Sequence, residues 1–196
     1  MRRIVVGITG ATGVIYGVRL LERLREVDVE THLVISRWGA RTLLHETPHS
    51  REYVETLASA SYQAGDMGAA IASGSFQTAG MVIAPCSAKS LAAIAHGYGD
   101  SLIHRAADVT LKERRPLVML VREAPLSTIH LENMVKLSRM GAVMLPPVPA
   151  FYHSPRTLDD IVDHTVARVL DQFGIEHPAT LRWSGEMGVG AADEDH

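Results

Sequence analysis

Apolar and polar positions divide the chain into blocks of two kinds. Short apolar runs rich in β-branched residues predict buried strands at residues 3–8, 29–35, 80–84, 117–121 and 142–145. Between these runs, apolar residues recur at helical spacing, which predicts helices at residues 14–26, 37–45, 52–59, 87–96, 105–114, 128–139 and 157–173. Residues 67–80 fit neither pattern. Because strands and helices alternate, we expect an α/β fold, a doubly wound parallel sheet in a Rossmann-like or flavodoxin-like three-layer sandwich.

The length of 196 residues fits one domain, which we place at residues 1–185. The acidic segment 186–196 has no apolar periodicity and is predicted to be a disordered tail. Without Asp193, Glu194 and Asp195, the chain has 19 acidic residues against 19 basic ones, so no nucleic-acid partner is expected. No apolar run is long enough to span a membrane. The chain has a single cysteine, Cys86, which favours a reducing, cytoplasmic setting.

The carboxyl ends of the strands are the places to search, because ligands of such sheets bind there. The first strand ends in GITGATG, where Gly10 and Gly13 allow close backbone approach and the following helix offers free N–H groups to an anion. A tight turn with glycine for packing is the alternative. The second strand ends in Ser36, where a dinucleotide-binding protein would carry an acidic residue. This argues against NAD and leaves a mononucleotide possible, although Ser36 can equally be a helix cap.

The third strand ends in APCSAKS, which repeats this arrangement. Ser87 and Ser90 place hydroxyl groups in the first turn of a helix that points at the same edge of the sheet. Capping alone also accounts for Ser87. Cys86 has no identifiable partner base, so we interpret it as a buried thiol rather than a nucleophile.

Two charged groups remain ambiguous from spacing alone. Arg122 and Glu123 directly follow the strand 117–121. They are either candidate site residues or a surface ion pair. Arg105, Asp108 and Lys112 share one helical face, with Asp108 four residues before Lys112, which is typical of a solvated salt-bridge ladder. The ten histidines form no HExxH motif and no cluster with cysteine, so no metal site is expected.

Longer motifs carry a family resemblance. GITGATG, APCSAKSLAAIA, the block from RAADVTLKERRPL to PPVPAFYH and RVLDQFGI resemble the flavin prenyltransferases (UbiX-like proteins) over residues 3–185. The resemblance implies transfer of a dimethylallyl group from dimethylallyl monophosphate to N5 and C6 of reduced FMN, without a metal. It also implies a homododecamer with sites at subunit interfaces, and delivery of the prenylated FMN to a UbiD-like decarboxylase. The chain looks closest to the subgroup associated with phenolic acid decarboxylation.

The resemblance also assigns residues. Those matching the flavin-binding positions are Gly10, Ala11, Thr12, Ser36, Ser87, Ala88, Lys89, Ser90 and Arg122. Those matching the prenyl-phosphate site are Lys112, Tyr152 and Arg168, with Arg105 and the aromatic Trp183 nearby. Glu46 and Glu123 match acidic residues implicated in proton handling and phosphate departure, so the catalytic set is Glu123, Glu46, Lys112 and Arg122.

Two other functions stay open at this point. A decarboxylase of the phosphopantothenoylcysteine class shares the fold and FMN, but it has a catalytic histidine and a PASANT-like turn where this chain has PCSAKS. A non-catalytic flavin-binding subunit of an aromatic acid decarboxylase complex is the third hypothesis.

Overall fold

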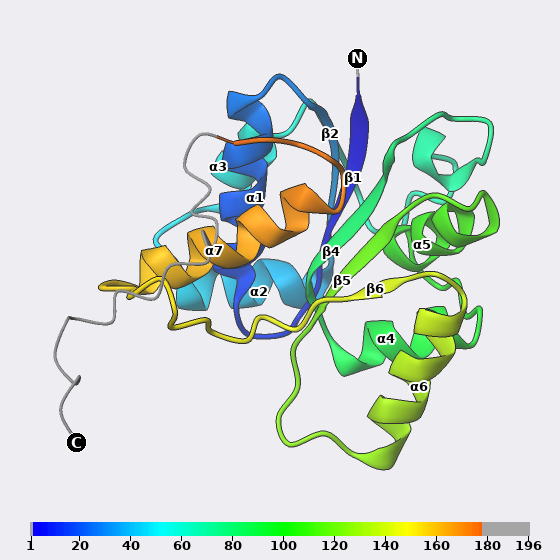
Figure 1. Ribbon diagram of the computed structural model, residues 1–196. Helices are drawn as coiled ribbons and strands as arrows, with labels where there is room; N and C mark the ends of the chain where they lie inside the picture. The colour runs from blue at the N-terminus through cyan, green and yellow to red at the C-terminus, as the bar shows by residue number, and fades with distance from the viewer. Residues whose placement is uncertain (1, 178–196) are drawn as a thin grey trace, which may run out of the picture.

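The computed structural model describes residues 2–177, which form one sheet covered by helices (Figure 1). Its strands are β1 (Arg3–Ile8), β2 (Glu30–Ile35), β3 (Ala60–Tyr62), β4 (Gly80–Cys86), β5 (Leu117–Val121) and β6 (Val143–Met144). Its α-helices are α1 (Val14–Glu26), α2 (Arg37–Glu46), α3 (Arg51–Leu57), α4 (Ala88–Ala95), α5 (Leu102–Lys112), α6 (Thr128–Arg139) and α7 (Leu158–Asp171). A 3₁₀ turn at Ala70–Ala72 lies within the segment that fitted neither pattern.

The strand order is β3-β2-β1-β4-β5-β6, and all neighbouring strands are parallel. The chain builds outward from β1 to β3 and then returns to β4 on the other side of β1. The order therefore reverses between β1 and β4, where a crevice opens outside the carboxyl ends of the strands. The doubly wound parallel sheet predicted from the alternation of elements is confirmed.

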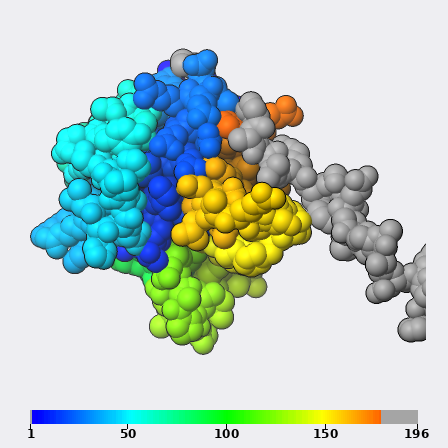
Figure 2. Space-filling view, turned by 90° about the vertical axis from the view of Figure 1, so that its left-hand side faces the viewer, coloured from blue at the N-terminus to red at the C-terminus, as the bar shows by residue number. Residues whose placement is uncertain are grey.

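Two apolar cores lie on opposite faces of the sheet, because successive side chains of a strand point to opposite sides. In β4, Val82 and Ala84 join the core beneath α1 and α7, while Met81 and Ile83 join the core beneath α4 and α5. Figure 2 shows the first of these faces, where α1 in blue lies between the cyan residues of α3 and the orange residues of α7. Both faces are therefore covered, as a three-layer sandwich requires.

Two features of the structure differ from the sequence prediction by more than two residues, whereas the other bounds agree to within two residues. The short edge strand β3 was not expected, because its three residues contain no apolar run. The helix predicted at 105–114 begins at Leu102 instead, because the Ser101 hydroxyl accepts a hydrogen bond from the His104 N–H and caps it. The tail at 186–196 lies outside the described residues, and no helix within 2–177 is long and apolar enough to cross a membrane.

Candidate functional site

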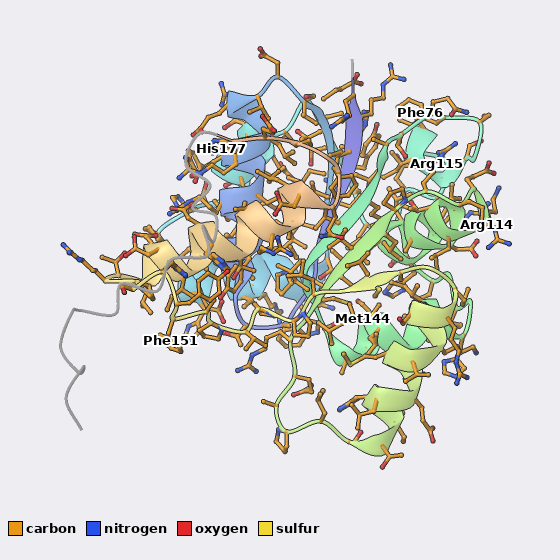
Figure 3. The ribbon with its side chains drawn as sticks, in the orientation of Figure 1. Phe76, Arg114, Arg115, Met144, Phe151 and His177 are labelled. Carbon is orange, nitrogen blue, oxygen red and sulfur yellow. The ribbon has the colours of Figure 1, made fainter. Side chains whose placement is uncertain are left out.

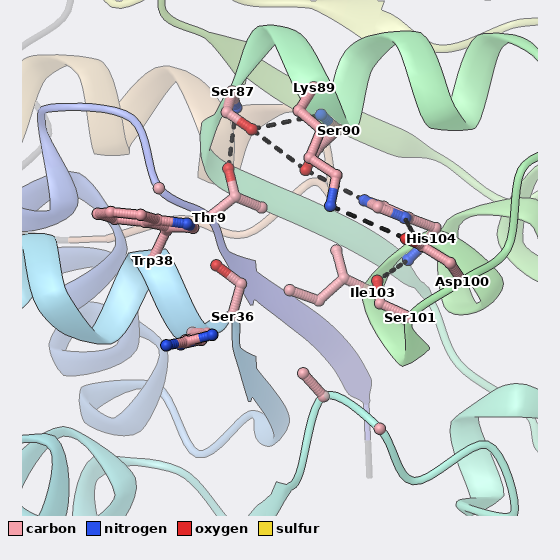
Figure 4. Close-up of a pocket in the computed structure, with 14 residues that line it drawn as sticks. Thr9, Ser36, Trp38, Ser87, Lys89, Ser90, Asp100, Ser101, Ile103 and His104 are labelled. Atoms are coloured by element: carbon pink, nitrogen blue, oxygen red, sulfur yellow. Dashed lines mark hydrogen bonds and ion pairs between the residues drawn. The ribbon is translucent and has the colours of Figure 1, made fainter.

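A cavity of about 710 Å³ opens at the point where the strand order reverses (Figure 4). The ends of β1, β2 and β4 supply part of its lining, and α5 and the loop before it supply another part. Five residues assigned to flavin binding line it, namely Gly10, Ser36, Ser87, Lys89 and Ser90. Its size falls within the ordinary range for small-molecule sites, about 300–1,000 Å³.

Thr9 joins the two central strands at the floor of this cavity. Its hydroxyl donates to the Pro85 carbonyl at 2.8 Å and accepts from the Ser87 N–H at 2.8 Å. The Ser87 hydroxyl in turn accepts from the Ser90 N–H at 3.3 Å, which caps α4. Sequence reasoning did not single out Thr9, because its role depends on the pairing of β1 with β4.

The first turn of α4 suits an anionic group. The N–H groups of Ala88 and Lys89 have no hydrogen-bond partner among residues 2–177, since the first N–H groups of a helix have no acceptor in the helix itself. Free N–H groups, the positive end of the helix dipole and two serine hydroxyl groups lie together beside the cavity. The site therefore fits the phosphate of a mononucleotide such as FMN.

The first turn of α1 is occupied differently from the expectation. The Glu46 carboxylate accepts hydrogen bonds from the N–H groups of Gly13, at 2.8 Å, and Val14, at 3.3 Å. Gly13 itself has a φ of 91°, which a residue with a side chain rarely adopts. An acidic side chain of the same chain thus takes the position at which the glycine-rich turn was expected to meet a ligand anion.

The remaining residues of that turn lie around the cavity rather than in it. Ala11 is buried and Thr12 is exposed, and neither lines the cavity, so their flavin contacts stay predictions. Gly10 does line it. Its lack of a side chain makes room for Trp38, because a Cβ at Gly10 would meet the Trp38 Cβ at 2.3 Å. Trp38 is 64% exposed, beside the cavity, with the Arg41 guanidinium 4.9 Å from its ring centroid. Ser36 is both a cap of α2 and a lining residue.

A second polar group at the cavity was missed by sequence reasoning. His104 of α5 contacts the Asp100 carboxylate through Nδ1 at 2.7 Å and the Ser90 hydroxyl through Nε2 at 3.2 Å. The side chains of Ser90 and His104 point toward each other across the cavity wall (Figure 4). His104 is 14 residues from Ser90 in the chain, so only the packing of α5 against α4 reveals their contact.

Arg122 and Glu123 follow β5 at the same edge of the sheet. The Arg122 N–H donates to the Cys86 carbonyl at 3.1 Å, which keeps this residue beside the end of β4. The Glu123 carboxylate accepts from the N–H of Ala124 at 3.2 Å. No ion pair within residues 2–177 joins Arg122 to Glu123, so the interpretation of the two as a surface salt bridge is wrong.

The other cations assigned to the prenyl phosphate each have a carboxylate close in the chain. Arg105 pairs with Asp108 at 2.6 Å, Lys112 pairs with Glu113, and Arg168 pairs with Asp171 at 2.8 Å. The expected pair of Asp108 with Lys112 is therefore wrong. Lys112 also lies eight residues beyond His104, the last residue of α5 that lines the cavity, or about 12 Å along the axis of α5.

Tyr152 and Arg168 lie in a separate region beside β6. A second cavity, of about 320 Å³, is lined by Arg168 and His164 of α7 and by the chain that follows β6. The Tyr152 hydroxyl contacts His164 Nε2 at 2.8 Å, and burial with the charges of His153 and Arg168 lowers the pKa of His164. Figure 3 shows Phe151, next to Tyr152 in the chain, on the opposite side of the molecule from Arg114, which is close to Lys112 in the chain. Trp183 lies outside the described residues.

Cys86 has the properties of an inert thiol. It is fully buried, and burial raises its pKa to about 12. The interpretation as a buried thiol is confirmed, since the reactive form of cysteine is the thiolate. Among residues 2–177, no group of three or more metal-ligating side chains is close enough to hold an ion.

Comparison with known proteins identifies the family of the chain. A family model described as Flavoprotein matches residues 1–170. A protein of Escherichia coli O157:H7 named "Probable UbiX-like flavin prenyltransferase" is 59% identical over 184 residues, which is 93% of each chain. The solved structure of a dodecameric FMN-dependent UbiX-like decarboxylase from the same organism has a TM-score of 0.92 and 59% identity, covering 93% of this chain and 100% of the other. AnUbiX (PadA1), solved with FMN and dimethylallyl pyrophosphate, has a TM-score of 0.94 and 49% identity over 95% of this chain and 99% of its own.

Proposed function

The chain belongs to the UbiX-like flavin prenyltransferases of the flavoprotein family, and from this we infer that it joins a dimethylallyl group to reduced FMN. Bonds to N5 and C6 would close a fourth ring on the flavin. The observation that carries the proposal is the cavity at the reversal of strand order, with the free N–H groups of α4 beside it. No metal takes part in the proposed reaction.

The α4 side of the cavity is the proposed holder of FMN. Ser87 and Ser90 offer hydroxyl groups, and the N–H groups of Ala88 and Lys89 suit the phosphate. Gly10 and Ser36 border the same space, as does Trp38, whose ring is a further candidate for contact with the flavin or the prenyl group. Thr9 holds β1 and β4 together beneath them.

The leaving phosphate of the prenyl donor needs several cations, and we assign Arg122, Lys112 and Arg168 to it, with Arg105 nearby and Tyr152 as a neutral donor. Arg122 is the one of these cations that has no carboxylate partner within residues 2–177. The others are in exposed ion pairs, which contribute only about 0–1 kcal/mol. Each charge-assisted hydrogen bond to a phosphate is worth about 1.5–3 kcal/mol, so the donor can compete for these cations.

Glu123 is the proposed proton-handling group of the reaction. It follows β5 at the cavity edge of the sheet, and its only hydrogen bond within residues 2–177 is to the N–H of Ala124. A carboxylate placed beside the flavin can remove the proton that is lost when the new ring closes. Glu46 is assigned to the same step by resemblance, although in this chain its carboxylate already binds the first turn of α1.

A complete site needs more than one copy of the chain. Lys112 lies about 12 Å along α5 from the cavity lining, and its ammonium group is paired with Glu113, so we propose that a neighbouring subunit supplies this lysine to the phosphate. The Escherichia coli O157:H7 relative is a dodecamer, and we propose the same assembly here. We also propose that the product passes to a UbiD-like decarboxylase in the cytoplasm.

Flavin mass is the measurement that tests this function. The purified protein is incubated without oxygen with reduced FMN and dimethylallyl monophosphate, or with the pyrophosphate bound to AnUbiX, and the flavin is examined by mass spectrometry. We expect the mass to rise by one isoprene unit with at least one donor. An unchanged flavin with both donors contradicts the proposal, and a decarboxylase acting directly would release carbon dioxide from an added acid with the flavin unchanged.

Glu123→Gln tests the assignment of the proton step. The variant keeps the shape of the side chain and removes its basicity, so we expect FMN affinity within about twofold of the original and turnover reduced by roughly 10²–10⁴-fold. Glu132→Gln, on α6, is the matched control and should leave turnover unchanged. Equal turnover in the Glu123→Gln variant and the unmodified protein would remove Glu123 from the proton step.

A further inference from the structure

A hydrogen-bonded chain of four side chains runs along one wall of the flavin cavity. Asp100 contacts His104 at 2.7 Å, His104 contacts the Ser90 hydroxyl at 3.2 Å, and the Ser87 hydroxyl donates to that of Ser90 at 3.3 Å. His104 is 5% exposed and Ser90 is 4% exposed. The proposed prenyl transfer uses the two serines as ligand contacts, but it gives no role to the Asp100–His104 pair.

The charge of His104 decides which way the Ser90 hydroxyl proton points. A neutral imidazole that donates from Nδ1 to the Asp100 carboxylate has a bare Nε2, which accepts the proton of the Ser90 hydroxyl. Ser90 then has only a lone pair left for a ligand. When His104 is protonated, Nε2 donates to the Ser90 oxygen, and the Ser90 hydroxyl is free to donate to an acceptor in the cavity.

The surroundings supply charges of both signs, and Asp100 is the carboxylate in contact with His104. From α4, Lys89 lies 3.8 Å from the other oxygen of Asp100. On α5 itself, Arg105 and Asp108 neutralise each other at 2.6 Å, and both line a small cavity together with His104 and Tyr98. Across the flavin cavity, α2 contributes Arg37. Asp100 can therefore support a positive charge on His104 without a second carboxylate.

The order Asp100, His104, Ser90 is also that of a hydrolase triad, but the burial of the serine opposes that function. Ser90 lies in the first turn of α4 with almost no exposed surface, and its oxygen already accepts the Ser87 hydroxyl. An acyl substrate has too little access to this oxygen for attack. A hydrogen bond to a ligand oxygen requires only that the Ser90 hydroxyl border the cavity, which it does, so a role in orienting this hydroxyl fits the same contacts.

We propose that Asp100 and His104 are positioning residues that turn the Ser90 hydroxyl toward the FMN phosphate, so that FMN binds more tightly when His104 carries a proton. The proposal rests on the proposed function only in taking FMN as the ligand. Protonation gives the phosphate an extra hydrogen-bond donor and a nearby positive charge, both of which favour an anion.

The test compares dissociation constants of FMN and riboflavin between about pH 5.5 and pH 8.5, a range that spans ordinary histidine titration. The FMN phosphate loses its second proton near pH 6, which tightens binding as pH rises in every variant. Deprotonation of His104 acts in the opposite direction and only where the histidine is present. We therefore compare the pH-dependent change in the unmodified protein with that in His104→Gln, which keeps a polar side chain that cannot titrate.

As pH rises across this range, we expect the fall in FMN affinity to be on the order of tenfold larger in the unmodified protein than in His104→Gln. Riboflavin affinity should be equal in the two proteins. Asp100→Asn should reduce the pH-dependent part of FMN binding, because the His104 ring loses the carboxylate that orients it. In a Ser90→Ala background, His104→Gln should add less than about twofold, because the effect passes through Ser90. His96→Gln, at the opposite end of α4, is the matched control and should behave as the unmodified protein.

Three results would overturn the proposal. They are superimposable FMN profiles for the unmodified protein and His104→Gln, an equal pH effect on riboflavin, and an undiminished His104→Gln effect without the Ser90 hydroxyl. Retained riboflavin binding shows that the His104→Gln cavity is folded, so a loss of structure cannot imitate the result. If the unmodified protein binds no FMN at any pH, the proposed function fails as well, whereas FMN binding without the expected profile removes this inference alone.

Discussion

Glu46 illustrates how a single residue can change the meaning of a motif. The glycine-rich turn before α1 has the strand–turn–helix context of an anion site. In the structure, its N–H groups bind the Glu46 carboxylate from the last turn of α2. The turn is therefore stabilised from within the chain, and the anion expected for the site is left to α4.

Substitution of Glu46 separates this structural role from a role in proton handling. Glu46→Ala removes both hydrogen bonds to the turn, and we expect the free energy of unfolding to fall by about 1–2 kcal/mol. Glu46→Gln keeps an acceptor oxygen and should cost about half as much or less. Stability is measured by urea unfolding at fixed protein concentration, with His45→Gln as the control.

The turnover of the same variants shows whether Glu46 also acts in proton handling. A purely structural Glu46 predicts that Glu46→Gln prenylates FMN at nearly the original rate. A similar loss of rate in the Gln and Ala variants, despite their different stabilities, would instead support the proton-handling role assigned by resemblance.

At the scale of elements, α1 and α7 are joined by charges as well as by the apolar core between them. Arg19 of α1 pairs with Asp159 and Asp163 of α7, each at 2.7 Å, and Arg23 pairs with Asp163 at 3.0 Å. Burial alone would lower the pKa of Arg19, but the two aspartates outweigh it and raise the pKa. Asp163, shared by two arginines, is the centre of this group.

We expect Asp163→Asn to lower the free energy of unfolding by about 1–2 kcal/mol, because two partly buried guanidinium groups lose their shared carboxylate. Asp159→Asn should cost less than about 0.5 kcal/mol, because the Asp159 side chain is 71% exposed. Urea unfolding of the two variants measures the difference. Equal losses would mean that the burial of Asp163 does not strengthen its ion pairs.

The pattern of apolar residues predicted most elements because each follows a period that the sequence displays. The strands β1 and β5 and the helices α1 and α6 have the predicted bounds. The strand β3 was not predicted, because an edge strand of three residues needs no apolar run. The start of α5 was predicted three residues too late, because the prediction relied on the charged residues that follow it and did not use the Ser101 cap.

At the scale of the whole molecule, the assigned residues divide into groups that one chain does not bring together. Ser87 and Ser90 line the flavin cavity, Arg168 lines another cavity beside β6, and Lys112 lies at the far end of α5. The strand-end pattern already indicated Ser87 and Ser90, and the resemblance added Arg168 and Lys112. Thr9, Trp38 and His104 required the fold, because their contacts join segments distant in the chain. A proposed site of this kind depends on assembly.

Complementation tests that dependence. Lys112→Ala and Arg122→Ala should each abolish most activity alone. If Lys112 acts on the site of a neighbouring subunit, co-expression of the two variants should restore activity in about one site in four under random mixing. The activity of tagged mixed oligomers, purified through both tags, measures this. Inactive mixed oligomers of normal size would place both residues in the site of the same chain.

The Glu46 carboxylate of α2, bound to the first turn of α1, also makes the two sides of the cavity electrostatically different. Of the helices that begin at this edge of the sheet, α1 and α4 follow the two central strands, and without Glu46 both would present positive ends to it. With Glu46 in place, one end is neutralised and the other, at α4, stays available to an anion. An anionic ligand that is charged at one end therefore meets two helix N-termini of unequal charge. The orientation with its charged end toward α4 has the lower energy. The fold thus selects the direction of entry before any contact specific to the ligand is made.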